Sequence, residues 1–143
     1  MKETVMAHLP PPPVVTQEVR IVDAQGHTRI LLSAKDGTPT ILLIGSDGAP
    51  RAMVALDAAG RPAVTLSNPD PTWPSAALAI DDKGAHVKFD RPGGASSYLF
   101  LNNAGGSGMV LIDAAGKRRI GMTVTPDGKT KVERLGDDGK PLP

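Results

Sequence analysis

Short apolar runs separated by Asp and Gly turns set the pattern of this chain. Each run holds five to seven residues rich in Val, Ile, Leu, Thr and Ala, which is typical of a short β-strand. Gly and Pro recur too often to leave room for a helix of ordinary length. The turn glycines lie 10 to 12 residues apart, with one interval of 24, at Gly26, Gly37, Gly48, Gly60, Gly84, Gly94, Gly105, Gly116, Gly128 and Gly139.

The single long interval contains a proline-rich loop, Asn68 to Pro74, which supplies the missing turn. The spacing therefore predicts about 10–11 short strands. Connections of four or five residues can join only antiparallel neighbours, because a parallel crossover needs a dozen or more. We expect an all-β fold, an antiparallel meander with internal hairpin repeats.

Two turn chemistries recur along the chain. Asp-x-x-Gly, at 23–26, 57–60 and 113–116, predicts a type I turn closed by a left-handed glycine. The Asp-Gly pairs at 36–37, 47–48, 127–128 and 138–139 predict two-residue type I′ turns, in which both central residues have positive φ.

Alternation of apolar and polar residues assigns one face of most strands to a core. The expected core pairs are Ile30/Leu32, Val54/Leu56, Val64/Leu66, Leu78/Ile80 and Val87/Phe89, with Ile120/Met122/Val124. Three runs are apolar on both faces: 41–44, 98–101 and 109–112. Both faces of those strands must be covered.

Two explanations for the two-sided runs stay open. The chain could fold as a sandwich or a closed barrel and cover them itself. Alternatively, the second apolar face meets copies of the same protein, as in a trimeric β-prism. The candidate oligomer face comprises Leu42, Ile44, Tyr98, Phe100, Val110 and Ile112. A homo-oligomer or another protein is the expected partner.

The chain also contains a longer internal repeat. Val22 to Pro50 aligns with Ile112 to Pro141 if one residue, Pro126, is inserted. We expect an N-terminal tail at 1–15 with a polyproline linker, Pro10–Pro13, followed by a hairpin-repeat domain at 16–143.

The pattern Asp-x-x-Gly-x-x-Arg, an apolar strand, Asp-Gly-x-Pro and another strand resembles that of uncharacterised bacterial hairpin-repeat proteins. The resemblance covers Val19 to Arg61, and Gly108 to Pro141 with Thr130 in place of the proline. Such proteins often carry a membrane or signal segment ahead of the repeats, so the resemblance implies a cell-envelope or secreted origin. It implies no activity.

Composition excludes several classes of function. Sixteen Lys and Arg against fifteen Asp and Glu are interspersed, so no basic stripe marks a nucleic-acid partner. Zero Cys removes thiolate catalysis, and an aromatic content of 3% is poor material for base stacking. No stretch approaches 18 apolar residues, so we expect no membrane insertion.

Few residues suggest chemistry. The turn aspartates are read as turn formers rather than calcium ligands, and His8, His27 and His86 are too scattered for a metal site, so no cofactor is expected. His86, beside Lys88 and Asp90, is the one candidate hydrolytic base.

Trp73, with Pro71 and Pro74, is the candidate partner contact, because it lies in the longest irregular loop. The first hypothesis is a non-enzymatic structural or protein-interaction module. A small-ligand-binding β-barrel is the second, and a hydrolase using His86 is the third.

Overall fold

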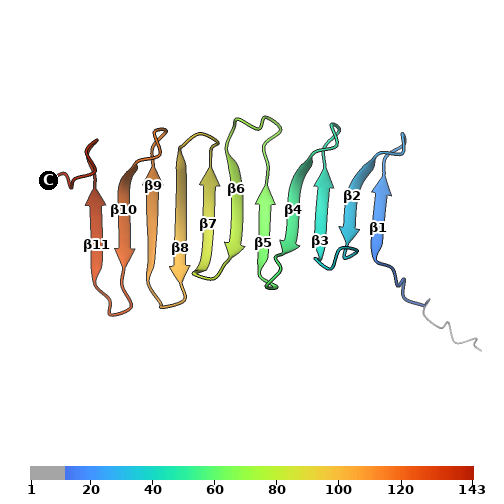
Figure 1. Ribbon diagram of the computed structural model, residues 1–143, viewed down its shortest axis with the longest axis horizontal. Coiled ribbons are helices and arrows are strands. Elements are labelled where there is room, and N and C mark those ends of the chain that lie inside the picture. The colour runs from blue at the N-terminus through green and yellow to red at the C-terminus, as the bar shows by residue number, and fades with distance from the viewer. Residues whose placement is uncertain (1–11) are drawn as a thin grey trace, which may run out of the picture.

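In the described part of the chain, eleven antiparallel strands follow one another in chain order (Figure 1). The computed structural model describes residues 12–143, and the tail predicted for 1–15 therefore lies mostly outside the described residues, as does His8. The predicted all-β meander is confirmed. The strands are β1 (Glu18–Val22), β2 (Thr28–Ser33), β3 (Thr40–Ile44), β4 (Pro50–Leu56), β5 (Pro62–Leu66), β6 (Ser75–Ile80), β7 (Gly84–Asp90), β8 (Ser96–Asn102), β9 (Ser107–Ile112), β10 (Arg118–Val124) and β11 (Thr130–Arg134).

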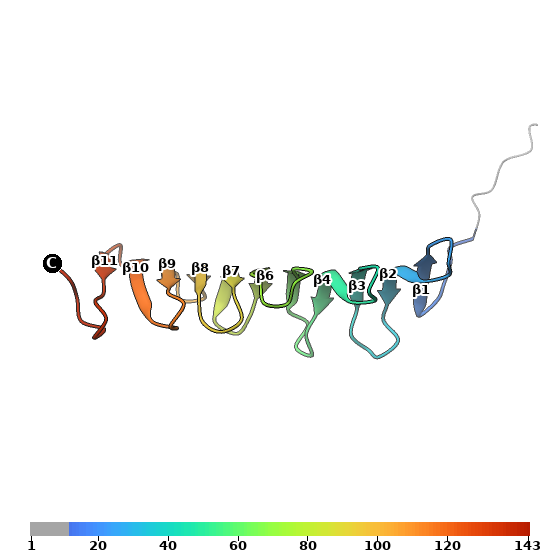
Figure 2. The same ribbon diagram turned by 90° about the horizontal axis from the view of Figure 1, so that it is seen from above.

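The strands form one open sheet, in which each strand pairs only with its neighbours in sequence. Strands β1 and β11 lie at opposite ends of the sheet (Figure 1). Viewed from above, the sheet is a single, nearly straight layer (Figure 2). Within residues 12–143 the chain forms neither the second layer of a sandwich nor the closed circuit of a barrel.

The Asp-x-x-Gly turns and the Asp-Gly turns share one backbone conformation. In the Asp23 turn the N–H of Gly26 donates to the carbonyl of Asp23 at 2.9 Å, and in the Asp-Gly turn at 47–48 the N–H of Gly48 donates to the carbonyl of Gly45 at 3.0 Å. Both glycines have a φ near +80°. Among the described residues only glycines have positive φ, so the predicted type I′ turns are wrong. A type I turn places its non-glycine residues at negative φ and needs a left-handed residue only at its end.

Little of the sheet is buried. Val110 in β9 is the one apolar side chain in the described part of the chain that is classed as buried, with 4% of its surface exposed. A single layer cannot enclose a core, because both of its faces are open to solvent. The strands are therefore held by their ladder hydrogen bonds and by contacts between neighbouring side chains.

Candidate interaction surface

The register divides the side chains between two faces, which we call face A and face B. Paired residues lie on the same side of a sheet, so each face can be followed from strand to strand. Face A carries this central ladder from β1 to β11: Val19, Leu32, Ile41, Val54, Val64, Leu78, Val87, Leu99, Met109, Met122 and Val132. Face B carries Arg20, Leu31, Leu42, Met53, Thr65, Ala77, Lys88, Tyr98, Val110, Gly121 and Glu133.

Face A is apolar and exposed. Its central ladder contains only Val, Leu, Ile and Met, and Leu99 and Val132 keep 60% and 67% of their surface exposed. Apart from Val22 beside the first turn, the exposed large apolar side chains of the strands all lie on this face. They are Val19, Ile21, Leu32, Ile41, Leu43, Val54, Leu66, Leu78, Ile80, Phe89, Leu99, Leu101, Met122, Val124 and Val132.

Face A is also uncharged from β1 to β10. No paired position of this face in β1 to β10 carries an ionisable side chain, and Arg134 in β11 is the first. The residues expected to form the core lie here, so alternation grouped them correctly. The prediction that these residues are buried is wrong for this chain, because the fold supplies no layer to cover them.

Face B holds the predicted oligomer residues. Tyr98 and Phe100 in β8 lie beside β9, whose Val110 pairs with Tyr98, and the two rings are 5.9 Å apart. Ile112 is on the same face of β9. Leu42 and Ile44 share this face but lie on β3, separated from β8 by four strands, so the six residues form two groups rather than one patch. None of the six is among the exposed large apolar residues, which on the strands lie almost entirely on face A.

Face B is also where the strand charges pair. The Arg118 guanidinium in β10 donates to the Glu133 carboxylate in β11 at 3.0 Å and extends over Gly121, the β10 residue that pairs with Glu133. Lys131 reaches the other carboxylate oxygen of Glu133 at 2.6 Å. Charges on the last strand of an open sheet discourage pairing with further strands.

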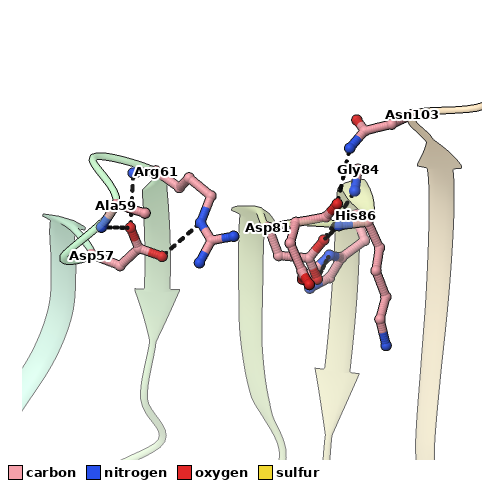
Figure 3. A network of polar contacts seen from close by, with 9 residues as sticks. Asp57, Ala59, Arg61, Asp81, Gly84, His86 and Asn103 are labelled. Carbon is pink, nitrogen blue, oxygen red and sulfur yellow. Dashed lines mark hydrogen bonds and ion pairs between the residues drawn. The ribbon is translucent and has the colours of Figure 1, made fainter.

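The turn aspartates bind their own backbone. Figure 3 shows the Asp57 carboxylate accepting hydrogen bonds from the backbone N–H groups of Ala59 and Arg61, at 2.8 and 3.0 Å, and from the Arg61 side chain at 2.8 Å. The backbone N–H of Arg61 and then its guanidinium hold the pKa of Asp57 below its ordinary value. Because the carboxylate is occupied by its own turn, these contacts support the interpretation of Asp as a turn former.

His86 lies on face B of β7, and its nearest acid is one that the sequence did not suggest. Its Nδ1 is 3.7 Å from the Asp81 carboxylate, in the turn before the strand (Figure 3). Lys88 instead pairs with Asp90 at 3.2 Å. Asp81 is itself held by the N–H groups of Lys83 and Gly84, at 2.8 and 3.0 Å, and those bonds lower its pKa. The Asp81 contact could have been inferred only from the turn conformation that folds it back.

The loop between β5 and β6 displays Trp73. The indole is 56% exposed, and the loop is shaped by Asp70, whose carboxylate accepts from the backbone N–H and the hydroxyl of Thr72 at 2.8 and 2.6 Å. The flanking Pro71 and Pro74 are exposed as well. A shallow hollow beside Trp73 is lined by Asp47 and Arg51, among other residues.

No cluster of three or more potential metal ligands occurs within residues 12–143. That same segment has no helix long and apolar enough to cross a membrane. No protein-family model matches the chain, and a comparison with curated proteins found no match. The surface itself therefore carries the functional argument.

Proposed function

We propose that this chain is a non-enzymatic structural module that assembles with copies of itself, and that face A is its contact surface. The observation that carries the proposal is the continuous, uncharged apolar face left open across the sheet. A large exposed apolar patch is typical of an interaction site, since soluble monomers rarely expose more than a few hundred Å² of contiguous apolar surface.

The dimensions of face A support a stable contact. Eleven strands about 4.8 Å apart span roughly 50 Å, and paired stretches of about five residues span roughly 17 Å, which gives a face of roughly 850 Å². A standard protein interface buries about 800 Å² on each partner. Covering face A once is therefore sufficient for a specific complex.

The shape of the sheet supports the same proposal. Neighbouring strands normally rotate by about 20–25°, which would turn the last of eleven strands by more than 180° relative to the first. In this sheet the axes of the strands stay almost aligned from one end to the other, and the layer is nearly straight (Figures 1 and 2). Flat sheets of many strands are usually stabilised by stacking against another layer.

The test compares two acidic substitutions in adjacent residues of β6. Leu78→Glu puts a carboxylate at the centre of face A, where 54% of the leucine is exposed in the single chain, and Ala77→Glu puts one on face B, opposite Lys88. Light scattering after size exclusion, from micromolar to submicromolar concentration, gives the mass of each. We expect wild type and Ala77→Glu to be multimers and Leu78→Glu to be a monomer.

A wild-type chain that is monomeric at every concentration would refute self-assembly and leave face A to a different protein. A Leu78→Glu variant that keeps the wild-type mass would show that the contact surface lies elsewhere. Circular dichroism of both variants establishes that the sheet is intact, so that a loss of mass is not a loss of fold.

A further inference from the structure

On either side of its central ladder, face A has an outer row of side chains. The sizes of these side chains follow a pattern. In each of β4 to β9 the first face A residue is small or Pro, and the third is large. The small residues are Ala52, Pro62, Ala76, Ala85, Ser97 and Ser107, and the large ones are Leu56, Leu66, Ile80, Phe89, Leu101 and Leu111. Every strand in this part of the sheet is therefore graded from small to large along its own direction.

Antiparallel pairing turns that gradient into an alternation. Because neighbouring strands run in opposite directions, their large ends lie on opposite sides of the sheet. On one side Leu66 of β5 lies between Ala52 and Ala76, and on the other side Leu101 of β8 lies between Ala85 and Ser107. Each outer row is thus a series of knobs and holes, and the two rows are offset by one strand.

The offset selects one way of bringing copies together. Suppose that the copies are related by rotation about an axis that runs across the strands, in the direction from β1 to β11. One outer row of the first copy then faces the other outer row of the next copy, and each strand lies level with the same strand of its neighbour. At β6 the small Ala76 then meets the large Ile80 of the neighbouring copy, and at β5 the large Leu66 meets the small Pro62. Filling holes with knobs gives the density of a protein interior.

The opposite arrangement mismatches the same residues. Two copies packed face to face with reversed strand order and full overlap, so that β6 lies over β6, bring each outer row against itself. Leu66 then faces Phe89 of the other copy, large against large, and Ala76 faces Ala76, small against small. Such contacts leave voids in one place and overlaps in the next, both of which are unfavourable.

Resting on the proposed function, we infer that the partner of face A is a second copy whose strand order runs in the same direction, so that equal strands meet. The gradient along β4 to β9 defines this polarity. The relation holds for two copies face to face and for three around a common axis, and it makes the assembly a closed ring with all first strands at one end.

Cysteine cross-linking tests the direction, because the natural chain has no Cys. Ala76→Cys and Ile80→Cys lie four residues apart on β6, about 13 Å along the strand, too far for a disulfide within one chain. We expect the double variant to form covalent multimers with a short bifunctional thiol reagent, because facing sheets pack about 10 Å apart and a direct disulfide needs a shorter distance. We expect neither single variant to do so. Ser97→Cys with Leu101→Cys on β8 is an independent second pair.

The outcomes separate this inference from the proposed function. Cross-linking of Ala76→Cys alone would mean reversed strand order and would overturn the inference while self-assembly stands. A multimer in which neither double variant cross-links would overturn it too. A monomeric wild type would overturn both proposals. Light scattering before cross-linking verifies that each double variant retains the wild-type mass.

Discussion

Truncating Leu99 to Ala removes an apolar side chain from the middle of face A, in β8. The leucine is 60% exposed in the single chain, so most of its burial remains to be gained on association. Fully burying a leucine stabilises by about 1.5–3 kcal/mol, and covering the remaining part contributes roughly 1–2 kcal/mol per copy. A contact between two mutated copies should therefore weaken by roughly 2–4 kcal/mol, which raises the dissociation constant by about 30- to 1000-fold.

The assay is a dilution series of wild type, Leu99→Ala and Leu42→Ala, with the fraction of multimer measured by sedimentation velocity. Leu42→Ala is the matched control, since it makes the same truncation on face B of β3. We expect the control to change the dissociation constant less than about threefold, although it lowers resistance to urea. Association weakened more by Leu42→Ala than by Leu99→Ala would refute the assignment of the contact to face A.

Three further predictions concern the strands, the turns and the ions. Gly84→Ala should lower the free energy of unfolding by more than about 2 kcal/mol in urea titrations, because its Cβ would overlap the backbone carbonyl of Leu101. Gly116→Ala places its Cβ in open space and should lower that free energy by about 1–2 kcal/mol, for its positive φ alone. Equal losses in the two variants would contradict this. Resistance to urea should fall as the pH drops below about 4, because the backbone N–H of Lys117 and the Arg119 guanidinium lower the pKa of Asp113 in the folded chain, so that the unfolded chain binds protons first. Asp113→Asn should make the stability depend less on pH, and an unchanged slope would argue against this account. Raising the NaCl concentration should not dissociate the multimer, since face A is uncharged in β1 to β10, and dissociation by salt would instead indicate an ionic contact.

The positions of the turns could be predicted from the sequence because glycine is the residue that tolerates positive φ. All ten glycines of the spacing pattern have it, from +75° at Gly116 to +150° at Gly84 and Gly94. The turn type was harder to predict. Asp-Gly is also the strongest short signal for type I′, and only the number of residues between the paired strands distinguishes the two turns. That number depends on the register, which the sequence does not give.

The grouping of side chains by face could also be predicted, but their exposure could not. Alternation places Leu78 and Ile80 on one side of β6 whatever lies beyond them. Whether a second layer covers that side depends on how far the sheet twists and closes, and the local pattern is the same in either case. The contact between His86 and Asp81 could not be predicted either, because it depends on how the turn before β7 folds back towards the strand.

A sheet whose strand order is its chain order has a distinctive response to mechanical load. The first and last strands lie at opposite edges of the sheet, and among residues 12–143 no strand contacts any but its sequence neighbours. A pull on the two ends acts across the strands and loads the hydrogen bonds of one strand pair at a time. A single chain should therefore extend by peeling from its edges in many small steps at low force. A second layer against face A would bind several strands at once and convert that gradual extension into a rigid response.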